Sequence, residues 1–171
     1  MPSSQSMIMS ADEQDRLMEW WNKTEEAKIV IQRLVSLITE LRVHPESSHA
    51  DGMVLFYRAA SEISYGYAGM RGCIRRSFTS EYSEPLRKNI VMCHNFAHKY
   101  SVDAKILLER VAKHITGPKA LQIINRIRDA LIENDAMLNE IAKKANAFFG
   151  KETFQSIQTK VNQSITLPSM G

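Results

Sequence analysis

The sequence has few of the features that would place a protein in a membrane, a secreted fold or a metal-binding class. No run of about 18 apolar residues is present, so no membrane-spanning segment is predicted. The first ten residues lack a basic stretch followed by an apolar one, so we expect no secretory signal. The two cysteines, Cys73 and Cys93, have neither zinc-like nor redox-like spacing. Free thiols in a reducing compartment are the simplest explanation, which predicts a cytoplasmic protein.

Two further absences concern the fold and its organisation. The sequence has no alternation of apolar and polar residues with turn chemistry, so no sheet is predicted. It also has no Pro/Gly/Ser-rich linker that would divide 171 residues into two domains. The net charge of +3 is mild and permits contact with nucleic acid or with an acidic protein without requiring either.

Apolar residues recur at alternating steps of three and four, and this spacing predicts helices. In the first predicted helix, Ser10 and Glu13 form a capping-box pattern, and His44-Pro45 ends the helix. The stripe of the first helix comprises Leu17, Trp20, Thr24, Ala27, Ile31, Leu34, Ile38 and Leu41.

The same spacing continues along the chain, with a second helix over 53–70 and a third opening at Pro85 and running to Tyr100. We expect Ser101 to cap a shorter fourth helix that ends before Gly117-Pro118, and a long fifth helix that ends at Gly150. A short amphipathic segment with Phe154, Ile157 and Val161 follows.

The sequence therefore predicts an all-α, single-domain helical bundle of four long helices plus one or two short ones. The bundle is expected over residues 10–161, with a flexible N-terminus over 1–9 and a flexible tail over 162–171. The core is predicted to contain eight aliphatic residues: Ile31, Leu34, Ile38, Ile63, Ile90, Ile124, Leu131 and Ile141. Asn134 falls on the apolar stripe of the last helix, where a buried amide would fix the register or partner, or else lie at a wet bundle end.

Three glycines spaced three apart, Gly66, Gly69 and Gly72, lie near the end of the second predicted helix. Such glycines either let another backbone come close or mark the end of the helix. They do not resemble a phosphate-binding loop, because no strand precedes them.

The third predicted helix carries one candidate site, because Arg87, His94 and His98 lie on one face. His94 and His98 have the i, i+4 spacing of metal ligands on a helix, but Asn95 stands where metalloproteases carry their catalytic Glu. We expect no metal and no other cofactor, and the histidines are interpreted first as a structural, half-buried pair.

Arg87 and His94 also permit a catalytic interpretation, because the six residues between them resemble the Arg-x(4–6)-His pattern of the HEPN ribonucleases, which are small helical bundles. The resemblance covers these two residues and the fold class. It implies metal-free RNA cleavage, usually in a dimer, with His94 as the acid/base and Arg87 holding the scissile phosphate.

A second candidate site is a basic segment, residues 71–88, with two aromatic residues between its cations. Its candidate partner-binding residues are Arg71, Arg75, Arg76, Phe78, Tyr82, Arg87 and Lys88. Because the glycines weaken the preceding helix, we expect this segment to project from the bundle. Glu81 and Glu84 would repel a phosphate backbone, so an acidic protein partner is preferred to nucleic acid.

Trp21 is a further candidate contact residue, because adjacent tryptophans on a helix point about 100° apart and Trp20 already occupies the stripe. No acid/base pair, activated nucleophile or phosphate loop has diagnostic spacing, so an enzyme is not favoured. The prediction is a non-enzymatic binding or regulatory module that acts through protein contacts, either as a monomer or as a homo-oligomer. The sequence is also compatible with a HEPN-like ribonuclease or a nucleic-acid-binding bundle, and no membrane partner is expected.

Overall fold

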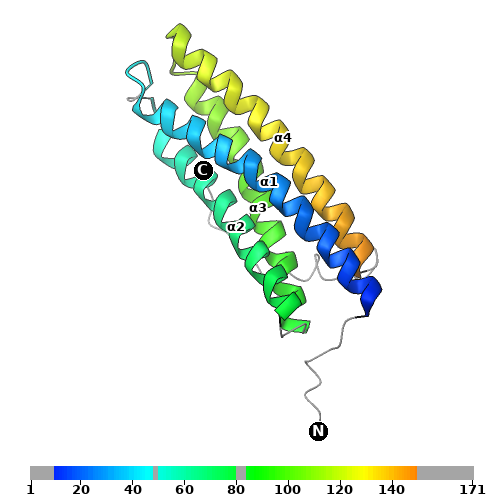
Figure 1. Cartoon of the computed structure of the whole chain (residues 1–171). Coiled ribbons are helices and arrows are strands. Elements are labelled where there is room, and N and C mark those ends of the chain that lie inside the picture. The colour runs from blue at the N-terminus through cyan, green and yellow to red at the C-terminus, as the bar shows by residue number, and fades with distance from the viewer. Residues whose placement is uncertain (1–9, 48–49, 80–83, 150–171) are drawn as a thin grey trace.

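The computed structural model describes residues 10–47, 50–79 and 84–149, and within these ranges the chain forms four helices and no strand (Figure 1). They are α1 (Ala11–Val43), α2 (Met53–Thr79), α3 (Glu84–Ala112) and α4 (Pro118–Phe149). The prediction of an all-α bundle is confirmed. No helix in this described part combines the length and the apolar character that crossing a membrane requires.

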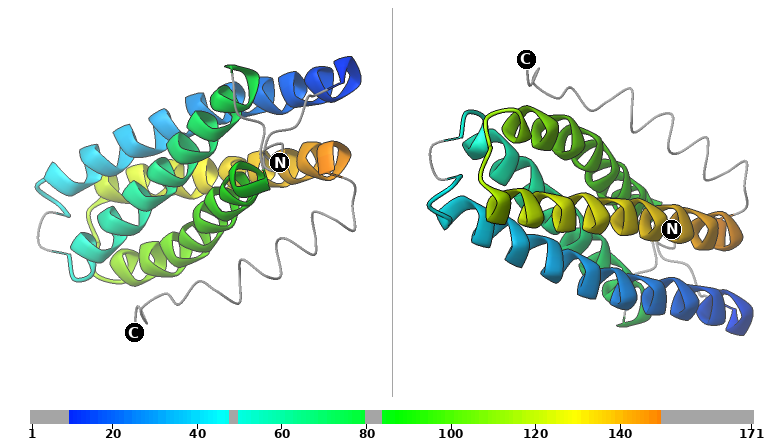
Figure 2. Two further views of the ribbon diagram at one scale, coloured as in Figure 1. Left: turned by 90° about the horizontal axis from the view of Figure 1, so that it is seen from below. Right: turned by 90° about the horizontal axis from the view of Figure 1, so that it is seen from above.

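The four helices pack as an up-and-down bundle in which successive helices are antiparallel (Figure 1). Each helix contacts the next one along the chain, and α4 returns to α1, so the helices enclose one apolar core. Figure 2 shows α1 beside α4 and α2 beside α3, as two crossing layers of two helices. The eight aliphatic residues predicted for the core are all buried.

The start of α1 follows the predicted capping chemistry. The Ser10 hydroxyl accepts a hydrogen bond from the Glu13 amide at 3.1 Å, and the Glu13 carboxylate accepts one from the Ser10 amide at 3.3 Å. These two bonds satisfy amide groups that have no partner inside a helix. All eight residues of the predicted stripe are buried, whereas Trp21 is only half-buried at its edge.

The predicted helix boundary at Ser101 is wrong, because α3 continues through it to Ala112. The Ser101 side chain is fully buried and donates a hydrogen bond to the Asp135 carboxylate at 2.8 Å. It also accepts one from the side-chain amide of Asn134 at 2.9 Å. Ser101 is therefore bonded across to α4 instead of capping a helix, and the buried Asn134 fixes the register of α3 against α4.

The glycines do not interrupt α2, which runs through all three of them to Thr79. A Cβ added to Gly66 would lie 2.9 Å from the Ala97 Cβ, and one on Gly69 would lie 2.9 Å from the Cys93 Sγ. Both glycines therefore allow α3 to approach closely. Because Ile74 is fully buried beyond Gly72, the expectation that the basic segment projects from the bundle is wrong for residues 71–79.

A side chain from the α1–α2 connection caps the first turn of α4. The Glu46 carboxylate accepts a hydrogen bond from the Ala120 amide at 2.8 Å, at a helix end that favours negative charge. Gly117 leaves room for this carboxylate, because a Cβ there would displace the Glu46 side chain from its present position. The predicted N-terminus 1–9, the segment with Phe154, Ile157 and Val161, and the tail 162–171 lie outside the described residues.

Candidate functional site

Two features that are fifty residues apart in the sequence meet on one surface of the bundle. Trp21 lies on α1 and Arg71 on α2, and the Arg71 guanidinium carbon is 4.4 Å from the centre of the Trp21 ring. The Arg75 guanidinium carbon, one turn further along α2, lies 5.7 Å from the same ring. Both distances are within the range of a cation–π contact. Two guanidinium groups therefore lie over the same indole ring.

Arg71 is held in place by further contacts with α1. Its guanidinium forms an ion pair with Glu25 and donates a 3.4 Å hydrogen bond to the Thr24 hydroxyl, which itself donates to the Trp21 carbonyl oxygen at 2.7 Å. The hydrogen bond from Arg71 is the main cause that lowers the pKa of the Glu25 carboxyl group. Because only 13% of the Arg71 side chain is exposed, this residue mainly fixes the surface.

Arg75 and Phe78 extend the same side of α2, since they lie four and seven residues beyond Arg71. Arg75 is exposed, and 37% of Phe78 is exposed. Trp21, Arg71, Arg75 and Phe78 are called the Trp21 surface below. It combines fixed and accessible positive charge with aromatic area, and sequence patterns could not join α1 to α2 in this register.

The other predicted partner-binding residues are distributed differently. Arg76 is exposed on α2, where its charge acts on the Cys73 thiol, on the side that faces α3. Lys88 is exposed in the second turn of α3. Tyr82 and the Arg87 side chain lie outside the described residues. The structure thus divides the predicted basic segment instead of presenting it as a single group of cations.

The two histidines of the other candidate site have unlike environments. Only 4% of His94 is exposed, and its Nε2 lies 3.1 Å from the Leu138 carbonyl oxygen, so this nitrogen donates a hydrogen bond to α4. Burial is the main cause that lowers the pKa of His94, which favours a neutral ring. His98, one turn later, is exposed. The pair does not form a common site open to solvent.

This geometry gives little support to catalysis or metal binding by the pair. An acid/base residue must reach its substrate, whereas His94 is covered and bonded to a main-chain carbonyl. Within residues 10–47, 50–79 and 84–149, no three His, Cys, Asp or Glu side chains are grouped so that they could hold a metal ion. His94 therefore has the arrangement of a structural core residue.

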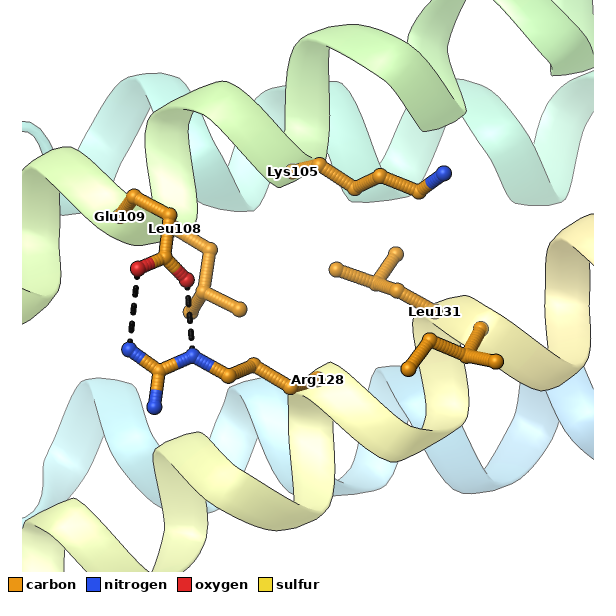
Figure 3. A pocket seen from close by; sticks show the side chains of 6 residues that line it. Lys105, Leu108, Glu109, Arg128 and Leu131 are labelled. Atoms are coloured by element: carbon orange, nitrogen blue, oxygen red, sulfur yellow. Dashed lines mark hydrogen bonds and ion pairs between the residues drawn. The ribbon is translucent and has the colours of Figure 1, made fainter.

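A hollow between α3 and α4 has a volume of about 230 Å³. Figure 3 shows the Arg128 guanidinium crossing from α4 to the Glu109 carboxylate on α3. The two hydrogen bonds measure 2.7 and 3.0 Å, and they raise the pKa of Arg128 and lower that of Glu109. The remaining lining is mostly aliphatic, with Leu108 and Leu131 among it. Such a bidentate pair links α3 to α4 across the hollow.

Comparison of the chain with protein-family models, with curated proteins and with solved structures gives no match. The function is therefore argued from the contacts and exposure of the described side chains. Among them, the Trp21 surface combines the largest number of sequence-predicted contact residues.

Proposed function

We propose that this chain is a non-enzymatic binding module, with a regulatory role, that holds an acidic protein segment on the Trp21 surface. The observation that carries the proposal is the placement of Arg71 and Arg75 over the ring of Trp21. Fixed guanidinium groups bind carboxylates in a defined geometry, and tryptophan and arginine are the residues enriched where protein interfaces have most of their binding energy.

The individual side chains supply different parts of the contact. Arg71 is already paired with Glu25, whereas Arg75 is exposed and can donate hydrogen bonds to a carboxylate of the partner. The half-buried Trp21 and the partly exposed Phe78 offer apolar area beside it. An acidic segment that also carries an apolar side chain matches this combination.

A protein partner is favoured over nucleic acid for an electrostatic reason. The Trp21 surface has one exposed arginine, Arg75, because Arg71 is already paired with Glu25, and the net charge of the whole chain is only +3. Binding to nucleic acid gains most of its affinity from many phosphate contacts. The two free cysteines support the cytoplasm as the place of action.

The first test uses a 15-residue peptide of glutamates with leucine at every fourth position, and measures binding by fluorescence anisotropy across a salt titration. Arg75→Glu should weaken binding at least fivefold, because it replaces the accessible cation. Lys113→Glu makes the same charge change at an exposed position near the end of α3 and should change binding less than twofold.

Three results would contradict the proposal. The peptide fails to bind the wild-type chain, the two variants bind equally, or polyuridylate binds more tightly than the peptide. Circular dichroism of Arg75→Glu must match the wild type, and Arg75→Ala offers a milder second variant with the same expected direction.

A further inference from the structure

The two cysteines lie far apart in the sequence but meet between α2 and α3. Cys73 lies on α2 and Cys93 on α3, and both are free and half-buried. Their thiols share a hydrogen bond, through which each one acts on the pKa of the other. The pair is therefore a cluster of two nucleophilic side chains from different helices, which the spacing of the cysteines in the sequence did not indicate.

The packing of the helices directs the two thiols toward each other. In a helix the Cα–Cβ bonds lean toward the N-terminus, and α2 and α3 are antiparallel, so their facing side chains lean in opposite directions (Figure 1). The Cys93 carbonyl oxygen lies 3.1 Å from the position that a Cβ would take on Gly66, whereas the Cys93 sulfur lies 2.9 Å from that position on Gly69. Cys93 thus reaches along α2 toward Cys73, which is one turn beyond Gly69.

The glycines also bring the two backbones close together. A disulfide requires Cα atoms within about 7 Å of each other, a separation that only closely packed helices reach. Gly66 and Gly69 provide this packing on α2, because neither has a side chain where α3 approaches. On the outer side of the pair, Cys93 lines an open hollow of about 330 Å³ together with Tyr65, Met92 and Phe96. A small molecule can reach the pair through this hollow.

The surroundings assign different roles to the two thiols. Burial raises the pKa of both, and that of Cys93 to about 11. The charge of Arg76 and the hydrogen bond from Cys93 act in the opposite direction on Cys73, because both favour its thiolate. Cys73 therefore ionises before Cys93 and is the first nucleophile of the pair.

We propose that Cys73 and Cys93 are a modification site, at which exchange with a small-molecule disulfide links α2 to α3 by a reversible disulfide bond. Zinc would need three or four ligands, and in residues 10–47, 50–79 and 84–149 no third His, Cys, Asp or Glu side chain joins the two thiols. The pair is thus suited to exchange between sulfur atoms.

The exchange takes place in two steps. Cys73 gives its proton to water, and its thiolate attacks one sulfur of the small disulfide, so that one small thiolate leaves and a mixed disulfide remains on Cys73. Cys93 then loses its proton and attacks the Cys73 sulfur, and the second small thiolate leaves. The two leaving thiolates take up the two protons. Two protein thiols are oxidised, and the small disulfide is reduced to two thiols.

The test incubates the reduced full chain with oxidised glutathione and follows the products by non-reducing mass spectrometry. The wild type should lose two hydrogen atoms and keep no glutathione, and peptide mapping should join Cys73 to Cys93. Cys93→Ser should stop at the mixed disulfide and form it at least about fivefold faster than Cys73→Ser, because Cys73 is the first nucleophile. The corresponding alanine variants are a second pair with the same expected order.

Two results of this test would overturn the proposal. Glutathione persists on the wild type, or disulfides join separate chains instead of the two helices. A matched control, Met92→Cys with Cys93→Ser, moves the second thiol by one residue, about 100° around α3, to an exposed position. This chain should keep glutathione on its thiols, and a Cys73 disulfide that forms as fast as in the wild type would contradict the geometry.

A second measurement is urea denaturation of the oxidised and the reduced wild type. The oxidised chain should unfold at a higher urea concentration, because the cross-link restricts the unfolded chain between residues 73 and 93. A chain with both Cys73→Ala and Cys93→Ala should not respond to the same treatment. An equal or lower midpoint for the oxidised wild type would show that the disulfide distorts the helices and would overturn the proposal. Loss of the peptide binding proposed for the Trp21 surface would leave these results unchanged, so the two proposals fail independently.

Discussion

Helix α2 contacts its two neighbours by different means. Toward α3 it presents Gly66 and Gly69, and the two helices approach until a single Cβ would reach the Ala97 side chain and backbone. Toward α1 it presents Arg71 and Arg75, long side chains that lie over Trp21 at the surface. The α2–α3 contact leaves no space for a larger side chain at Gly66. The α2–α1 contact keeps the exposed guanidinium group of Arg75 accessible to solvent. The comparison indicates that α2 is fixed by α3 and offers its other side for binding.

The largest effect is expected where the contact is closest. Gly66→Leu should lower the free energy of unfolding by about 3 kcal/mol, because the new side chain collides with Ala97 across α3. The measurement is urea denaturation followed by circular dichroism. Gly72 is the matched control, since a Cβ there meets nothing within 4 Å, and Gly72→Ala should stabilise the helix by about 0.5–1 kcal/mol. Similar losses in the free energy of unfolding at Gly66 and Gly72 would contradict the close contact of α2 with α3 at Gly66.

The second effect concerns the contact of α3 with α4, on the other side of α3 from α2. The buried His94 makes the stability of this contact depend on pH. The pKa of His94 is lowered from its ordinary value of 6.5, so between the two values the unfolded chain binds more protons than the folded one. The stability from neutral His94 is therefore complete above about pH 6.5 and is lost as the pH falls below it.

The corresponding test replaces His94 by a residue that donates a hydrogen bond without titrating. Between pH 7.5 and pH 5.5 the wild type should lose more stability than His94→Gln, because only the wild type has a buried ring that must take up a proton. His98→Gln, at the exposed histidine, should keep the wild-type pH dependence. Parallel pH profiles for the wild type and His94→Gln would contradict the structural role of the buried ring.

The smallest effect distinguishes the two arginines of the Trp21 surface. Arg71→Ala should cost about 1 kcal/mol, because it removes a cation–π contact and a partly covered ion pair with Glu25. Arg75→Ala should cost less than about 0.5 kcal/mol, since Arg75 is exposed and further from the ring. Thermal unfolding measures both. A larger loss for Arg75 would show that the accessible arginine is the structural one.

The bundle was predictable because its signals are local. The 3-4 spacing along α1 and the Ser10–Glu13 capping box depend on residues within a few turns of one another. The prediction for Ser101 was wrong for the same reason, because a serine before an apolar run has the pattern of a cap. The partner that keeps it inside the helix, Asn134, is 33 residues away on α4.

The individual residues of the candidate site were predicted from the sequence, but their contact with one another was not. Trp21 and Arg75 were each expected to contact a partner, but their meeting depends on the register of α1 against α2. That register follows from packing across the whole core, which includes the close approach at Gly66. The burial of His94 depends likewise on α4, so its spacing from Arg87 indicated a common face without indicating what covers it.

The hydrogen bond from the Ala120 amide to Glu46 joins residues 74 positions apart, the first turn of α4 and the connection between α1 and α2. The bond therefore ties two connections at the same end of the bundle to each other. In hydrogen exchange, the Ala120 amide should report the opening of this end of the bundle as a unit.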